Sequence, residues 1–236
     1  MFFRSSPRTS WLEKAVARVF KDRKLREDQL LPFGFAQGES GFSHGAKLLG
    51  GMFEMVVEIR ADGSVHAAVC GSGEKENEMV HLARKSPSSF MDRQLRKEFE
   101  EELWHVAECC FEPDVFKHEL TKRLIAYVQA SYGDDLEYLW RRSPESAVVR
   151  RRDSRKWYAV FLMVPRLKLG GDSGEPVEVL NLRLDPCELE RYVDGVSRFP
   201  AYHMNKKSWV SLCLDGSVPF EELAERLDAS YRLALK

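Results

Sequence analysis

The sequence contains no long hydrophobic run. Its longest apolar stretch, Trp157–Pro165, is far shorter than the roughly 20 residues that a helix needs to cross a bilayer. The first residues also lack the apolar core of a secretory signal, which takes roughly 7–15 residues. We therefore expect a cytoplasmic protein without membrane contact.

The chain also lacks an excess of charge of either sign. Its 236 residues include 36 Lys plus Arg and 37 Asp plus Glu, for a formal net charge of -1. This balance excludes a globally basic nucleic-acid-binding domain. Charged residues make up 31% and hydrophobic ones 44%, which argues against disorder. Composition thus predicts a globular protein of one large or two ordinary domains.

Patterns that bind metals or perform catalysis are scarce. The five cysteines include no C-x-x-C pair and the six histidines no H-x-x-x-H pair, so we expect no metal and no cofactor. We expect the cysteines to be mostly buried free thiols. The string Gly171-Asp172-Ser173-Gly174 is similar to the nucleophile segment of chymotrypsin-like proteases, but no partner segment accompanies it. We predict no catalytic residue and a protein that is not an enzyme.

Residues 1–112 are predicted to form a smaller α+β domain. Hydrophobic residues recur at helical spacing between Leu12 and Phe20. The glycine-rich stretch 32–51 indicates a loop with one short strand. Alternating residues around Asp62-Gly63 predict a hairpin with a two-residue turn. A second helix is predicted by the apolar stripe Leu95, Phe99, Leu103, Val106 and Cys110.

A domain boundary is predicted near residues 111–114. Pro113 interrupts the helical pattern, and Asp114 can cap a third helix. Gly133 is predicted to end that helix, because glycine accepts the left-handed conformation. The second domain is therefore predicted to span residues 113–236.

The second domain is predicted to pack an antiparallel sheet against helices. Residues 147–151 and 156–166 form a hairpin, and the second strand is apolar on both faces, so it should be central and covered. The apolar residues of the next strand stand first at odd positions, Val177 and Val179, and then at even positions from Leu180 to Leu184. This change of parity suggests a bulge or bend. Asp185-Pro186 begins a short helix, and a further strand and helix follow it. Helices against an antiparallel sheet define the α+β class.

A long motif in this second domain resembles the MmcQ/YjbR family. The motif consists of the run Phe199-Pro200-Ala201-Tyr202-His203-Met204-Asn205-Lys206-Lys207-Ser208-Trp209, then Leu214-Asp215-Gly216 and Ser230-Tyr231. The match covers roughly residues 116–236, and the first hundred residues look like the N-terminal extension of longer members. The resemblance implies a compact α+β domain likened to secretion chaperones and described as a double-wing DNA-binding shape. It carries over no catalytic residue.

Two segments hold the candidate binding residues. Tyr202, His203, Asn205, Lys206 and Lys207 combine cations, an amide and an aromatic ring, which are means of contacting phosphates and bases. The alternative is a structural lead-in to a strand, with Asn205 in a turn and the lysines in solvent.

The second segment is a basic hairpin. Its candidate residues are Arg150, Arg151, Arg152, Arg155 and Lys156. If about six cations neutralised phosphates, raising the salt from 50 to 200 mM would lower DNA affinity roughly a thousandfold. The alternative is a sheet edge protected by charge against aggregation.

The leading hypothesis is thus a non-enzymatic DNA-binding protein that uses both segments. The alternative hypotheses are a protein-binding, chaperone-like adaptor and an unrecognised enzyme with a cleft near His203. The sequence does not predict an oligomeric state.

Overall fold

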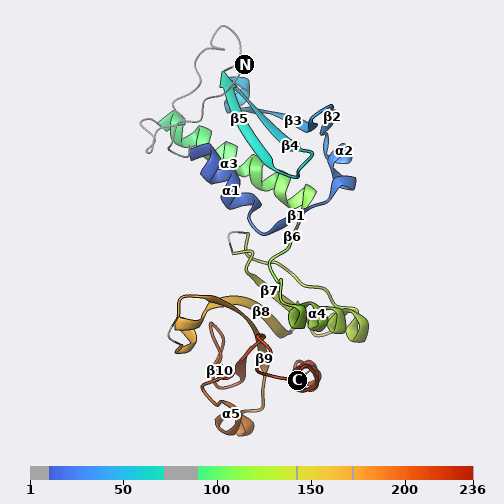
Figure 1. Cartoon of the computed structure of the whole chain (residues 1–236), viewed down its shortest axis with the longest axis vertical. Coiled ribbons are helices and arrows are strands. Elements are labelled where there is room, and N and C mark those ends of the chain that lie inside the picture. Colours follow the sequence, from blue (N-terminus) through green and yellow to red (C-terminus); the bar gives the residue numbers. More distant parts are fainter. Residues whose placement is uncertain (1–10, 72–89, 142, 172, 236) are drawn as a thin grey trace. The chain divides into compact units, whose positions relative to one another are not determined.

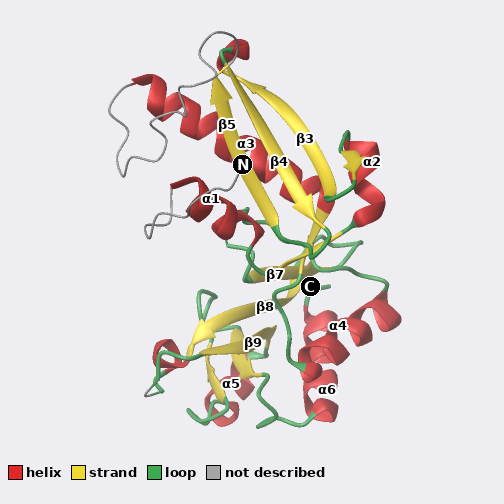
Figure 2. Ribbon diagram, turned by 45° about the horizontal axis from the view of Figure 1, so that its top comes forward, coloured by secondary structure: helices red, strands yellow, loops and turns green. Residues whose placement is uncertain are grey.

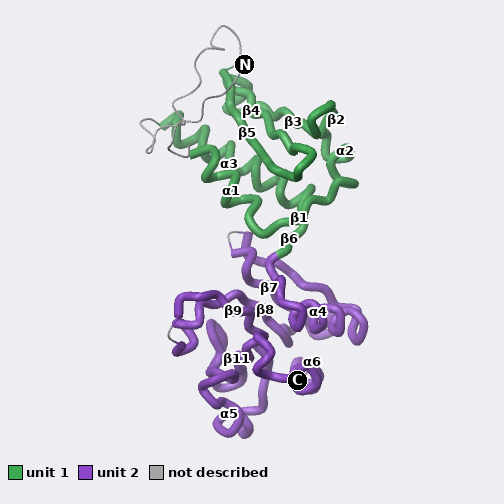
Figure 3. Tube along the Cα trace, viewed as in Figure 1, with its two compact units in different colours: residues 1–114 green, residues 115–236 purple. Residues whose placement is uncertain are grey.

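The computed structural model describes residues 11–71, 90–141, 143–171 and 173–235 (Figure 1). The chain divides into two compact units, residues 1–114 (unit 1) and 115–236 (unit 2), shown in green and purple in Figure 3. Both units combine helices with antiparallel sheets, so the predicted α+β class is confirmed.

Unit 1 contains a four-stranded antiparallel sheet in the order β2-β3-β4-β5, and a two-stranded pair of β1 and β6. Figure 2 shows α1 and α3 alongside the larger sheet, and contacts join α1 to β5 and α3 to β3. The helices are α1 Trp11–Phe20, α2 Leu30–Phe33 and α3 Phe90–Cys110. The strands are β1 Arg23–Leu25, β2 Ala36–Gly38, β3 Gly41–Leu48, β4 Phe53–Arg60, β5 Val65–Gly71 and β6 Phe111–Pro113.

The larger sheet of unit 1 buries one face. In β4, Met55, Val57 and Ile59 are at most 1% exposed, while the alternating residues Glu54 and Glu58 are exposed. A period of two is what a half-buried strand requires. The apolar stripe predicted for the second helix is confirmed, because all its residues are buried in the same core: Leu95, Phe99, Leu103, Val106 and Cys110.

Two predicted details of unit 1 are wrong. The glycine-rich stretch 32–51 is not mainly loop, since β3 pairs with β4 along its whole length. Pairing with β2 and β4 on its two sides holds this strand despite its low intrinsic propensity. The β4–β5 turn is longer than two residues. Arg60 exchanges backbone hydrogen bonds with Gly63 and Ser64, and Gly63 has φ of 80°, as in three-residue hairpin loops.

Unit 2 contains a five-stranded antiparallel sheet in the order β10-β11-β9-β8-β7. Its helices α4 and α6 contact each other, and α6 lies against β8 and β9. The helices are α4 Glu119–Tyr132, α5 Pro186–Tyr192 and α6 Phe220–Leu233. The strands are β7 Ser146–Arg150, β8 Trp157–Pro165, β9 Pro176–Arg183, β10 Arg198–Pro200 and β11 Trp209–Cys213.

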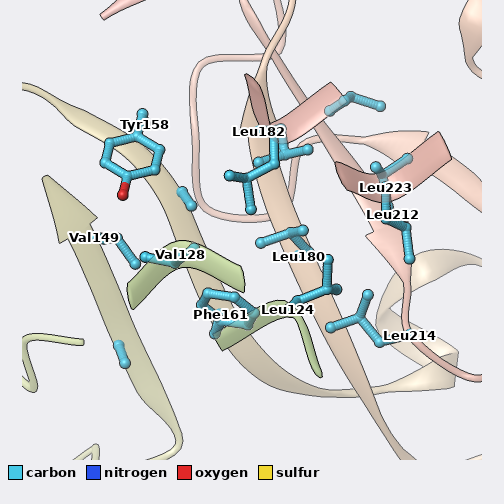
Figure 4. Packing of buried hydrophobic residues seen from close by; sticks show 14 of the residues in the cluster. Leu124, Val128, Val149, Tyr158, Phe161, Leu180, Leu182, Leu212, Leu214 and Leu223 are labelled. Carbon is cyan, nitrogen blue, oxygen red and sulfur yellow. The ribbon is translucent and has the colours of Figure 1, made fainter. Parts of the chain in front are cut away.

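The five-stranded sheet is apolar on both faces, as predicted for β8. Figure 4 shows the larger core, where Phe161 and Leu180 lie near Leu124 of α4. The smaller core, on the other face, includes Val160 and Val179 together with partly buried residues of the segment 199–204. Residues of β8 are therefore covered on both sides.

The bulge predicted in the segment around residues 177–184 is wrong. Val177 and Val179 belong to the smaller core, whereas Leu180 and Leu182 belong to the larger one. The strand β9 pairs with both neighbours without a register shift. The change of parity arises because both faces of this strand are buried. The register shift of this sheet lies instead between β7 and β8, near Arg150.

The predicted cap of the third helix is also wrong, although its end is confirmed. The helix α4 begins after His118, whose ring nitrogen accepts a hydrogen bond from the Leu120 amide at 3.3 Å. Asp114 instead donates its backbone amide to Asp22 in unit 1. Gly133 ends α4 in the left-handed region at φ of 67°. The predicted start of α5 at Asp185-Pro186 is confirmed, and the Asp185 side chain caps the helix by accepting from the Cys187 amide.

The cysteines are less buried than predicted. Cys110 and Cys213 are buried, but Cys70, Cys109 and Cys187 are exposed. Neighbouring positions in a helix face different sides, so Cys109 is exposed while Cys110 enters the core. Among the residues that the structure describes, no helix is long and apolar enough to span a membrane.

Candidate nucleic-acid interface

The two basic segments lead into strands that begin at the same end of the five-stranded sheet. Because the strands are antiparallel, β7 and β9 finish at the end where β8 and β11 begin. We call this the hairpin end, and its strand termini are Arg150, Trp157, Arg183 and Trp209. Adjacent strands are about 4.8 Å apart, so the starts of β8 and β11, with β9 between them, lie roughly 10 Å apart.

Hydrogen bonds connect the strands across the hairpin end. The Arg183 Nε donates to the Trp157 carbonyl at 2.6 Å. Next along β9, the Leu184 amide donates to the Ser208 carbonyl at 3.0 Å. These bonds join the β7–β8 turn to the segment that carries Lys206 and Lys207.

The first three arginines of the hairpin are engaged within unit 2. Arg150 forms an ion pair with Glu137. Arg152 bonds the Gly133 carbonyl, and its Nε lies 3.3 Å from Asp134. The charge of each guanidinium is thus balanced or partly balanced by a carboxylate before any ligand arrives.

Arg151 is the most deeply engaged of the three. It is 6% exposed, and it donates two hydrogen bonds to Asp153, at 2.8 and 2.6 Å. Its Nη1 also donates to the Tyr231 carbonyl at 3.0 Å, and its guanidinium lies 3.8 Å from the centre of the Tyr231 ring. The bonds from Arg151 lower the pKa of Asp153 to about 2. Arg151 therefore attaches the turn to α6.

The last two cations of the hairpin reach solvent. Arg155 and Lys156 are both exposed. Arg155 has φ of 57°, and its amide donates to the Arg151 carbonyl at 3.0 Å, so the turn that Arg151 anchors also presents Arg155. Arg152 is exposed as well, so three of the five predicted hairpin cations reach the surface, and Arg152 is the one of them that lies beside Asp134.

The Tyr202–Lys207 segment has an inward and an outward set of residues. Tyr202 is half-buried and packs against the smaller core, and its ring centre lies 4.0 Å from that of His203. His203 is exposed at φ of 57°. Lys206 and Lys207 are exposed.

Asn205 takes the turn role that the alternative interpretation assigned to it. Its side-chain oxygen accepts from the Lys207 amide at 3.0 Å, and its carbonyl accepts from the Ser208 amide at 3.1 Å. Asn205 thus shapes the turn from which both lysines project.

A buried polar network, not anticipated from the sequence, positions this segment. Asn181 and Ser211 are both fully buried and face each other across β9 and β11. The Ser211 hydroxyl donates to Asn181 Oδ1 at 2.6 Å and accepts from the Tyr202 amide at 2.8 Å. Asn181 Nδ2 donates to the Tyr202 carbonyl at 2.8 Å. The available signal was an asparagine in an otherwise apolar strand.

Aromatic side chains adjoin the cations. Trp140 is 41% exposed, and its ring meets the half-buried Trp157 ring nearly edge-on, with 5.9 Å between centres. The Arg183 guanidinium lies 4.8 Å from the centre of the Trp209 ring. Burial lowers the pKa of Arg183.

In the described part of the chain, neither the metal search nor the hollow between α5 and α6 adds support to the hypothetical cleft near His203. No group of three or more His, Cys, Asp or Glu in the described ranges is arranged to hold a metal ion. A hollow of about 240 Å³ lies between α5 and α6 and includes Arg226 and Glu188 in its wall. His203, the residue of the hypothetical catalytic cleft, is not part of that wall.

The class of protein defined by this fold is an α+β domain with one antiparallel sheet, α4 and α6 against one face and a chain segment across the other. The YjbR family model matches residues 129–233, which lie within unit 2. An uncharacterized protein of Bacillus subtilis, YyaQ, is 32% identical over 120 residues, covering 51% of this chain and 94% of that protein. The chain belongs to the YjbR family.

Solved structures show the same partial coverage. A crystal structure of a Pseudomonas syringae protein is 30% identical, has a TM-score of 0.47, and covers 48% of this chain and 97% of that chain. A Deinococcus radiodurans protein with a DUF419 domain is 28% identical, with a TM-score of 0.39, and covers 49% of this chain and 78% of that chain.

Proposed function

We propose that unit 2 is a non-catalytic DNA-binding module that contacts phosphates at the hairpin end of its sheet. The observation that carries this proposal is the strand order, which brings the exposed cations of two distant segments to one end of one sheet. The cations that we propose as phosphate contacts are Arg155 and Lys156 from the β7–β8 turn, and Lys206 and Lys207 from the lead-in to β11.

The proposed footprint is smaller than the sequence suggested. Arg150, Arg151 and Arg152 already serve Glu137, Asp153 and Asp134. A phosphate would have to compete with these carboxylates for each guanidinium, so we expect the three arginines to contribute less to ligand binding. They instead hold the turn in the shape that presents Arg155.

The footprint sets the expected salt dependence. Four phosphate contacts give a slope of about −3.6 in log affinity against log salt on a DNA duplex. Affinity then falls about 150-fold between 50 and 200 mM salt, rather than the roughly thousandfold that six contacts would give.

The adaptor alternative receives less support. A protein-docking surface calls for a contiguous exposed apolar patch of several hundred Å² or more. The large exposed hydrophobic residues that the structure describes in unit 2 lie on different elements, and only the first two are neighbours in sequence: Leu139, Trp140, Leu167, Val196 and Leu235. Scattered apolar residues of this kind are normal on protein surfaces.

The test measures binding of the full chain to a fluorescein-labelled 20-base-pair duplex by anisotropy between 50 and 200 mM NaCl. Lys206→Ala combined with Lys207→Ala should weaken binding and reduce the salt slope by about 2. The control, Lys122→Ala combined with Lys168→Ala, removes the same charge. Lys122 lies in the first turn of α4 and Lys168 in the β8–β9 connection, at the opposite end of the sheet. Equal effects of the two double variants, or no binding at 50 mM, would contradict the proposal.

A further inference from the structure

We propose that the hairpin end selects single-stranded DNA, with an unpaired base stacked on Trp140 beside the cations. This inference rests on the proposed function, because it names the form of DNA that the same site takes. It is carried by a different set of side chains, the aromatic residues around the start of β8.

Trp140 offers a ring that unit 2 covers only in part. It is 41% exposed, and its contact with Trp157 is nearly perpendicular, at 87°. An edge-to-face contact sets the edge of one ring on a face of the other, so Trp157 covers at most one face of the Trp140 ring. Trp157 begins β8 and packs against the smaller core, so the Trp140 ring, which comes from the segment before β7, lies against a side chain held by a strand.

The aromatic pair is continuous with the cationic surface. The Trp157 carbonyl accepts a hydrogen bond from Arg183 Nε at 2.6 Å, and the Arg183 guanidinium lies over the Trp209 ring. Arg183 contacts a carbonyl and a ring, neither of which carries a negative charge. Arg183 therefore links the start of β8 to the start of β11, the strand that Lys207 precedes, and adds positive charge at the hairpin end.

Aromatic rings beside a track of cations are the means by which proteins bind single strands. The cations follow the backbone, and bases stack on the rings. A duplex keeps its bases stacked on one another, so it gains phosphate contacts at this surface but nothing from Trp140. The difference between the two forms of DNA should therefore depend on this one side chain.

The test compares a labelled 20-nucleotide single strand of thymidines with a labelled 20-base-pair duplex on the full chain at 100 mM NaCl. Trp140→Ala should weaken single-strand binding roughly 5- to 150-fold, the range of stacking on one aromatic residue. It should leave duplex binding unchanged. Trp140→Phe should restore much of the single-strand affinity, because it keeps a ring.

Leu167→Ala is the matched control, since Leu167 is 62% exposed and lies in the β8–β9 connection, at the far end of the sheet. It should change neither affinity. Equal affinity for the two forms of DNA, or equal losses for both in Trp140→Ala, would overturn the stacking proposal. If Lys206→Ala with Lys207→Ala still weakened duplex binding, the proposed function would survive that result. No binding of either form would overturn both.

Discussion

Replacing Asn181 by leucine should loosen the segment that carries Lys206 and Lys207. The substitution keeps the approximate volume but leaves the Ser211 hydroxyl without its acceptor and the Tyr202 carbonyl without its donor. A buried polar group without a partner costs about 1–3 kcal/mol. Because Tyr202 is half-buried, water can replace part of its loss, so we expect about 2–4 kcal/mol in total.

The loss should appear in urea denaturation of the full chain. With a slope of about 2 kcal/mol per molar urea, the midpoint of the transition of unit 2 should fall by about 1–2 M. Hydrogen exchange should assign the loss to this unit, through faster exchange of amides in β9 and β11. DNA affinity should fall as well, because the lysines no longer project from a fixed turn.

A double-mutant cycle with Ser211→Ala distinguishes a network from two separate contacts. Each single variant leaves the other residue of the pair without a hydrogen-bond partner. The double variant should therefore be less destabilised than the sum of the two single variants, by about 0.5–3 kcal/mol. Additivity to within about 0.5 kcal/mol, or an unchanged midpoint in Asn181→Leu, would refute the reasoning.

Three further predictions concern stability and reactivity. Burial would raise the pKa of Asp215, but hydrogen bonds from Ser217 and Arg166 lower it to about 2. Its stabilising contribution should thus be complete above about pH 4 and be lost as the pH falls towards 2, and Asp215→Asn should flatten acid denaturation there while lowering stability at pH 7. Gly41→Ala should destabilise unit 1 in thermal melts by at least about 1–3 kcal/mol, since its φ is 138° and a side chain would collide with β4; Gly63→Asn, with open space around Gly63, should cost less, and equal losses would contradict this account. Thiol labelling of the native protein should modify the exposed cysteines quickly and the two buried ones, whose pKa burial raises to about 11, only on unfolding; rapid labelling of all five would disprove this assignment. The exposed set is Cys70, Cys109 and Cys187, and the buried set is Cys110 and Cys213.

Much of the fold could be predicted from local patterns. The apolar stripe of α3 and the alternation in β4 each follow from the period of one element. The two apolar faces of β8 likewise required a covered strand. The family resemblance came from the contiguous run that ends at Trp209. These signals are local in sequence, so they do not depend on knowing which elements meet.

The composition of the candidate site could be predicted only in part, because its charge depends on distant partners. Nothing in the sequence around Arg150 or Arg152 indicates that these arginines form ion pairs with Glu137 and Asp134. The prediction of a bulge around Val179 was wrong for a related reason. Because β9 packs against a core on each face, its apolar residues change from odd to even positions without any change of register. Asn181 became interpretable only once β9 and β11 were known to be neighbours.

The segment 199–207, which covers the second face of the unit 2 sheet, contains core residues and solvent-facing residues in alternation. Ala201, Tyr202 and Met204 close the smaller core, while His203 and Lys206 face water. Selection for a folded chain acts on the first set, and only selection for an external contact acts on the second. Saturation mutagenesis scored separately for abundance and for ligand capture would therefore give two complementary tolerance profiles along a single stretch of chain.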